Sequence, residues 1–74
     1  MNKYVIHIPT EIKDHRLGQD YQRMKLGQHG ARWIQWLSSV SRSDGYRYHT
    51  WRIHCDEQTL TMLILAMNAR MVFG

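Results

Sequence analysis

Residues 46–55 alternate between two classes of side chain, and this pattern constrains the fold more than any other stretch of the sequence. Trp51, Ile53 and Cys55 fall on one side of an extended chain. Successive side chains of a β-strand point to opposite faces of its sheet. We therefore predict a strand over residues 46–55 that buries this face in the core. The opposite face would carry Tyr46, Tyr48, Thr50, Arg52 and His54.

The segment after this strand carries the signals of a helix. Asp56 is placed to act as an N-cap, and Glu57 stands in the first turn, where the helix dipole favours an acidic side chain. The core stripe recurs at helical spacing and consists of Leu60, Leu63, Ile64 and Met67. We predict a helix over residues 57–67 and a final strand over residues 70–73. The apolar surface of this helix is wider than one sheet can cover, and a homodimer would cover the remainder.

The first half of the chain gives weaker periodic signals. Residues 3–8 are rich in β-branched and aromatic side chains, and they predict a strand that stops at Pro9. The apolar residues of segment 9–28 fit no single period, and two glycines within it weaken a continuous helix. We expect a loop there, with a helical turn over residues 20–25 for which Asp20 could serve as the N-cap.

Residues 29–40 show the spacing of an amphipathic helix. Their apolar side chains recur at i, i+3, i+4 and i+7, in the order Trp33, Trp36, Leu37 and Val40. We therefore predict a helix over residues 29–40. Residues 41–45 are rich in serine, aspartate and glycine, and they predict the loop that leads into the strand over residues 46–55.

The predicted order of elements is strand, loop, helix, strand, helix, strand. A chain of 74 residues has room for one domain only. We therefore predict a single α+β domain over residues 1–74, with a three-stranded sheet and two helices on one face. The opposite sheet face would then be free of helices, and would be solvated, a dimer surface or a binding platform.

The sequence contains no arrangement of residues that identifies a reaction. Cys55 falls on the predicted core face, where a lone cysteine usually behaves as a small hydrophobe. Asp56 and Glu57 are consecutive and fit a helix start better than a pair of catalytic acids. Zinc needs three or four protein ligands at defined spacing, which the five histidines do not supply. We expect no enzymatic activity, no catalytic residues, no metal and no cofactor.

Cysteine usage and hydropathy indicate the cellular setting. The single cysteine cannot form an internal disulfide, as is usual for proteins of reducing compartments. The longest apolar stretch, residues 62–67, is far too short to cross a bilayer. No stretch near the start has the pattern of an export signal. We therefore expect a cytoplasmic protein with no membrane partner.

Charge and aromatic content together indicate a binding surface. The chain has a net charge of +4, and the whole excess lies within residues 15–52, mostly as arginine. Arginine binds phosphates and carboxylates in a bidentate manner, so nucleic acid and an acidic protein surface would both suit it. Aromatic and arginine side chains alternate in the strand over residues 46–55, as they do in many protein interfaces and nucleic-acid platforms. The predicted binding residues are Arg32, Trp36, Arg42, Tyr46, Arg47, Tyr48 and Arg52.

The order of these segments resembles that of small, mostly uncharacterised proteins encoded by bacteriophages. The features that carry the resemblance are the short first strand, the segments 12–14 and 17–21, and the closing strand and helix around Asp56 and Glu57. The resemblance implies expression in an infected bacterium and action by binding a host protein. Our leading hypothesis is a non-enzymatic protein that binds and modulates or inhibits a host protein. The alternative is a nucleic-acid-binding protein that uses the same patch.

Overall fold

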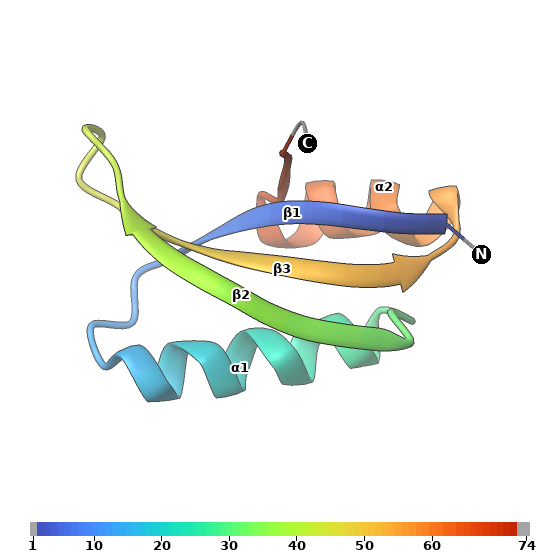
Figure 1. Cartoon of the computed structure of the whole chain (residues 1–74), viewed down its shortest axis with the longest axis horizontal. Helices are drawn as coiled ribbons and strands as arrows, with labels where there is room; N and C mark the ends of the chain where they lie inside the picture. The colour runs from blue at the N-terminus through green and yellow to red at the C-terminus, as the bar shows by residue number, and fades with distance from the viewer. Residues whose placement is uncertain (1, 73–74) are drawn as a thin grey trace.

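The computed structural model of the protein describes residues 2–72, which form two helices and an antiparallel sheet of four strands (Figure 1). The elements in chain order are β1 (Asn2–Thr10), α1 (His15–Gln28), β2 (Trp33–Ser41), β3 (Arg47–Cys55), α2 (Glu57–Met67) and β4 (Arg70–Met71). The strands lie side by side in the order β2-β3-β1-β4. This is the β-α-β-β-α-β arrangement known as ferredoxin-like. The α+β prediction is confirmed, whereas the prediction of a three-stranded sheet is wrong.

Strand β2 is the additional strand. The helix predicted over residues 29–40 is wrong, because most of this segment pairs with β3 in an antiparallel manner. Ile34 lies opposite Ile53 and Trp36 lies opposite Trp51, but the register shifts between Trp36 and Ser38. Ile34 and Trp36 therefore face the core, whereas Trp33 and Val40, opposite His54 and Tyr48, face the other side of the sheet. The stripe that predicted a helix thus mixes side chains from both faces of a strand.

Helix α1 occupies most of the segment predicted to be a loop. Its N-cap is Asp14 rather than Asp20, and the Asp14 carboxylate accepts the backbone N–H groups of Arg16 and Leu17, both at 3.0 Å. Gly18 lies inside the helix, close to β1 and β3. A Cβ atom at Gly18 would lie 3.3 Å from the hydroxyl oxygen of Thr10 in β1, a tight contact, and 3.5 Å from the Cε1 atom of His49. Gly18 therefore allows α1 to pack closely on the sheet and does not break the helix.

The remaining elements agree closely with the sequence. Helix α2 has the predicted bounds, and its N-cap Asp56 accepts the backbone N–H of Thr59 at 2.7 Å. Strand β1 continues through Pro9, which a strand tolerates where the missing N–H has no partner to meet. Strand β4 pairs with β1 only at Ile6 and His7, so β1 has a free edge beside Pro9. The predicted final strand is confirmed at Arg70–Met71, whereas Phe73 lies outside the described residues.

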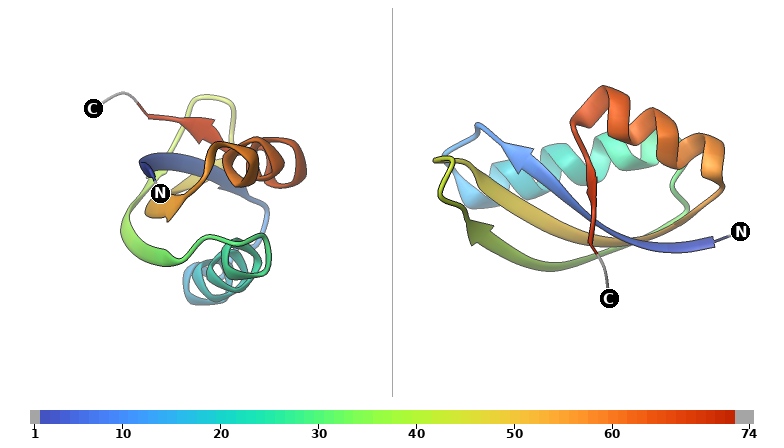
Figure 2. Two further views of the ribbon diagram at one scale, coloured as in Figure 1. Left: turned by 90° about the vertical axis from the view of Figure 1, so that its right-hand side faces the viewer. Right: turned by 90° about the horizontal axis from the view of Figure 1, so that it is seen from above.

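The core lies between the sheet and the two helices, which cover the same face of the sheet (Figure 2). The predicted core residues Trp51, Ile53 and Cys55 are all buried. The indole N–H of Trp51 donates to the side-chain oxygen of Gln22 at 2.7 Å, which fastens α1 to β3. Among the described residues, neither helix has the length and apolar character needed to cross a membrane.

Candidate functional site

The face of the sheet that faces away from the helices is the first candidate site. We call it the open face, and Figure 2 shows that no helix covers it. Alternation along the paired strands β1 and β3 decides which side chains it presents. The open face carries Lys3, Val5, His7, Tyr48, Thr50, Arg52 and His54, together with Arg42 from the β2–β3 loop and Arg70 from β4.

Tyr48 contacts three charged side chains at one end of the open face. The guanidinium groups of Arg42 and Arg70 lie over its ring, at 5.3 Å and 5.9 Å from the ring centroid. Its hydroxyl donates to the Asp44 carboxylate at 2.7 Å. Only 3% of Tyr48 is exposed. Tyr48 therefore holds charged groups in position and offers little surface of its own to a partner.

Arg42, Asp44, Tyr48 and Arg70 form a cluster whose charge is set by the Asp44–Tyr48 hydrogen bond. It raises the pKa of Tyr48, and it is also the main cause of the lowered pKa of Asp44. The backbone N–H of Tyr46 donates to the same carboxylate at 3.0 Å and lowers its pKa further. Asp44 is therefore ionised and Tyr48 protonated across the physiological pH range. A hollow of about 850 Å³ borders the cluster and is lined on one side by Ile64 of α2.

His7 connects the cluster to the centre of the sheet. Its Nδ1 atom lies 2.9 Å from the hydroxyl of Thr50, and its ring meets the Tyr48 ring edge to face at 6.3 Å. Burial, and to a lesser extent the nearby charge of Arg42, lower the pKa of His7. His7 is therefore neutral at neutral pH, and the positive charge beside Tyr48 belongs to the arginines.

A second aromatic feature lies at the other end of the open face. Trp33 and His54 are cross-strand partners, with ring centroids 4.9 Å apart and an angle of 42° between the rings. Trp33 is 45% exposed. The backbone N–H of Arg32, the residue before β2, donates to the carbonyl of His54 at 2.9 Å. This end of the open face therefore presents an accessible aromatic pair.

The structure brings together only part of the predicted patch. Arg42, Tyr48 and Arg52 belong to the open face, Tyr46 is exposed in the loop beside Asp44, and Arg32 lies beside the Trp33–His54 pair. Two residues are elsewhere. Trp36 turns toward α1, where its ring meets the His15 ring at 5.6 Å, and Arg47 belongs to the helix-covered face at the start of β3.

Sequence reasoning missed His7, Asp44, Thr50 and Arg70 as members of the site. His7 and Arg70 reach Tyr48 only because β1 lies between β3 and β4, and no local pattern reveals strand order. Asp44 was recognisable only as part of a polar loop. One signal was available, because alternation along the first strand puts Val5 and His7 on one face and Tyr4, Ile6 and Ile8 on the other.

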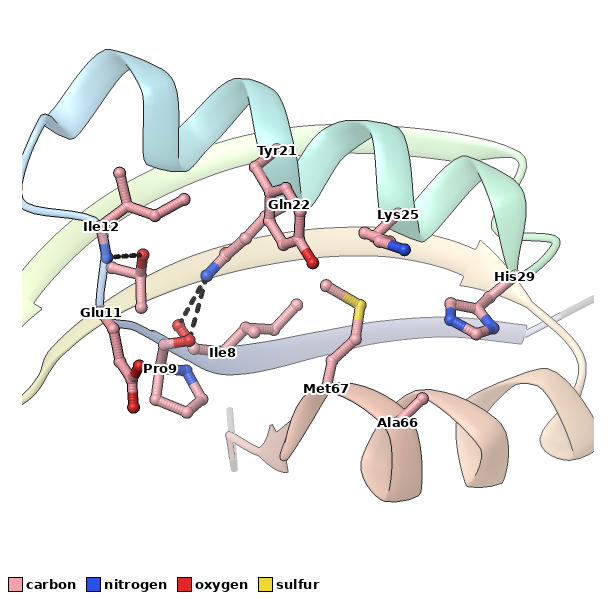
Figure 3. A pocket seen from close by; sticks show the side chains of 11 residues that line it. Ile8, Pro9, Glu11, Ile12, Tyr21, Gln22, Lys25, His29, Ala66 and Met67 are labelled. Carbon is pink, nitrogen blue, oxygen red and sulfur yellow. Dashed lines mark hydrogen bonds between the residues drawn. The ribbon is translucent and has the colours of Figure 1, made fainter.

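A groove between the two helices is the second candidate site. Figure 3 shows Lys25 of α1 and His29, the C-cap residue after α1, pointing into this groove of about 540 Å³, with Met67 entering from α2. The amide of Gln22 forms part of the floor, but it already donates to the carbonyls of Ile8 at 3.2 Å and Pro9 at 3.3 Å. The groove therefore combines apolar side chains with one lysine and one carboxylate, Lys25 and Glu11, and its most buried polar group already has hydrogen-bond partners.

Cys55 lies in the core rather than in either candidate site. Cys55 is 1% exposed, and burial raises the pKa of its thiol, which opposes the thiolate form that a nucleophile needs. Within residues 2–72, no three His, Cys, Asp or Glu side chains are grouped so that they could hold a metal ion. The arrangement of the open face suits recognition of an anionic surface.

Comparisons with family models, with curated proteins and with solved structures give no match for this chain. The β-α-β-β-α-β arrangement supports many unrelated functions, so the fold by itself indicates none of them. The functional argument therefore rests on the chemistry of the open face.

Proposed function

We propose that the protein is a non-enzymatic binding protein that recognises an acidic surface of another protein through the open face. The observation that carries the proposal is the pair of guanidinium groups, from Arg42 and Arg70, held over the ring of Tyr48. The resemblance to small bacteriophage proteins adds the expectation that the partner is a bacterial host protein, which binding would modulate or inhibit.

The charge of the open face supports an anionic partner. It presents four cationic side chains, from Lys3, Arg42, Arg52 and Arg70. Two carboxylates lie near them, those of Asp44 and of Glu11, which lines the hollow beside Tyr48 and Arg70. The Asp44 carboxylate already accepts two hydrogen bonds, from Tyr46 and Tyr48. The cations therefore keep most of their capacity for an outside partner, and their field would steer an acidic surface toward this face.

The two arginines over the Tyr48 ring are also held in position before a partner binds. A guanidinium that lies on an aromatic ring keeps its N–H donors in the plane of the group, where a carboxylate can accept two of them. Because Tyr48 is buried and hydrogen-bonded to Asp44, its ring provides a fixed support. Less side-chain freedom is then lost on binding than for arginines that move freely in solvent.

Single-stranded nucleic acid is the second candidate partner. The exposed Trp33 beside His54 is the observation that favours it, because bases stack on such rings and arginines hold the phosphates. At the other end of the open face, however, the guanidinium groups of Arg42 and Arg70 cover the Tyr48 ring. A base could not stack on Tyr48 without displacing them, and this favours a protein partner.

Affinity purification from a bacterial lysate tests the proposal with matched variants. The double variant Arg42→Gln/Arg70→Gln removes two cations from the open face and leaves Tyr48 in place. The control Arg16→Gln/Arg23→Gln removes two cations from α1, on the opposite side of the sheet. We expect the wild type and the control to retain a protein that the open-face variant loses, while circular dichroism shows that all three are folded.

Two results would contradict the proposal. Retention of the same proteins by the open-face variant would show that the arginines beside Tyr48 do not bind the partner. Tight binding of a labelled single-stranded oligonucleotide that weakens steeply with salt, together with no retained protein, would replace the proposal by the second candidate.

A further inference from the structure

A cluster of buried polar groups lies between β3 and the first turns of α1. His49 of β3 is 0% exposed, and neither of its ring nitrogens has a hydrogen-bond partner among residues 2–72. The hydroxyl of Ser39, which lies opposite His49 in β2, is buried without a partner as well. Buried polar groups are almost always paired with protein, water or a bound ligand. This cluster therefore has bonding capacity that the chain itself does not use.

His15, the first residue of α1, faces His49 from the helix. The centroids of the two imidazole rings are 5.3 Å apart, with an angle of 36° between the rings. Nitrogen–metal bonds in proteins are about 2.0–2.1 Å long, so two imidazoles that share one ion in tetrahedral geometry have centroids about 5.2 Å apart. The two rings therefore have the separation that a shared ion requires. Because His15 is exposed, its ring can turn a nitrogen toward the ion.

Gly18 provides space beside the Nε2 atom of His49. It stands three residues after His15, so both residues lie on the same face of α1. A Cβ atom at Gly18 would lie 3.6 Å from this Nε2 atom, so a longer side chain here would take up the space next to it. Burial, together with the neighbouring His15 and Arg47, lowers the pKa of His49. Its ring is therefore neutral at neutral pH, and neutral imidazole is the form that binds a metal ion.

We propose that His15 and His49 bind a divalent transition-metal ion between α1 and β3. Imidazole nitrogen suits such ions, whereas Mg²⁺ and Ca²⁺ prefer oxygen ligands. The hydroxyl of Ser39 is an acceptor of the kind to which metal-bound histidines donate their second ring N–H. No third His, Cys, Asp or Glu side chain within residues 2–72 joins the pair, so water completes the coordination. The site is therefore weaker than a zinc centre with three or four protein ligands.

The bound ion would connect α1 directly to β3. It stabilises the folded chain, because the unfolded chain does not hold the two histidines together. This site is separate from the proposed function. His49 belongs to the helix-covered face of the sheet, whereas Arg42 and Arg70 belong to the open face (Figure 2). Failure of the metal site would leave the binding of an acidic partner unaffected, and the reverse also holds.

Isothermal titration calorimetry of chelator-treated protein with Zn²⁺ at neutral pH tests the proposal. We expect the wild type to bind one ion per chain. His15→Ala and His49→Leu each remove one ligand and should raise the dissociation constant by at least about tenfold. His29→Ala is the matched control, because it removes a histidine at the other end of α1 and should bind Zn²⁺ like the wild type. In NMR spectra, Zn²⁺ should shift the ring signals of His15 and His49 before those of the other histidines.

Circular dichroism establishes that each variant is folded. Because His15 is exposed, His15→Ala is expected to fold even if His49→Leu does not. A wild type that binds no Zn²⁺ at millimolar concentration, unchanged affinity in the folded His15→Ala variant, or an equal loss in the His29→Ala control would each overturn the proposal. Ring signals of His7, His29 or His54 that respond before those of His15 and His49 would show an adventitious ion only and would overturn it as well.

Discussion

Replacement of His49 by leucine tests the energetic cost of a buried polar cluster beneath α1. His49 is 0% exposed, and neither of its ring nitrogens has a hydrogen-bond partner among the described residues. The hydroxyl of its cross-strand neighbour Ser39 and the indole N–H of Trp36 are buried without a partner in the same part of the structure. We expect His49→Leu to be more stable than the wild type at neutral pH.

The magnitude follows from the two nitrogens. Leaving a buried polar group without a hydrogen bond costs about 1–3 kcal/mol. Leucine is similar in volume to histidine and removes both groups, but an imperfect fit against Gly18 and His15 costs up to about 1.5 kcal/mol. The free energy of unfolding should therefore rise by at least about 0.5 kcal/mol. A gain of 1 kcal/mol raises the Tm of a domain of this size by about 4–8 °C.

The pH dependence provides a second, independent reading of the same substitution. Burial, the neighbouring His15 and Arg47 lower the pKa of His49 below its usual value of 6.5. Well above pH 6.5 the ring is neutral in both the folded and the unfolded chain, so its contribution to stability is constant there. As the pH falls below that value toward the folded pKa, the unfolded chain gains a proton that the folded chain resists, and stability is lost by up to about 1.4 kcal/mol per pH unit.

Urea unfolding followed by circular dichroism at pH 7.5 and at pH 5.5 measures both effects. The wild type should lose stability between these pH values, and His49→Leu should lose clearly less. Part of the loss remains in the variant, because burial also lowers the pKa of His7. A variant that is less stable than the wild type at pH 7.5, with an unchanged pH dependence, would show that the His49 nitrogens are well partnered and would refute the reasoning.

Three further predictions concern single contacts. Trp51→Phe removes the N–H group that donates to Gln22 and leaves a void, so the free energy of unfolding measured in urea should fall by about 2–4 kcal/mol. A loss below about 1 kcal/mol would show that this hydrogen bond does not hold α1 against β3. Asp56→Ala removes the N-cap of α2 and should lower the unfolding free energy by about 1 kcal/mol, and no change would mean that the cap is dispensable. In an ultraviolet titration Tyr48 should ionise above its usual pKa of 10.0, and Asp44→Asn should move it back toward that value; identical titrations would speak against their hydrogen bond.

The elements that could be predicted from the sequence are those with complete local signals. The strand over residues 46–55 has an unbroken alternation, and its core face is the buried one. Helix α2 has an N-cap, an acidic first turn and a regular apolar stripe, so its bounds Glu57–Met67 agree with the prediction. In both cases one segment contains all the information that its conformation requires.

The elements that could not be predicted depend on contacts with distant residues. The alternation of β2 is interrupted at the bulge after Trp36, and only pairing with β3 shows that this segment is extended. The apolar stripe of α1 is obscured by Gly18, where a side chain would crowd the Thr10 hydroxyl of β1, and by exposed Leu17 and Met24. Arg70 joined the site for the same reason, because the place of β4 beside β1 is a property of the whole sheet.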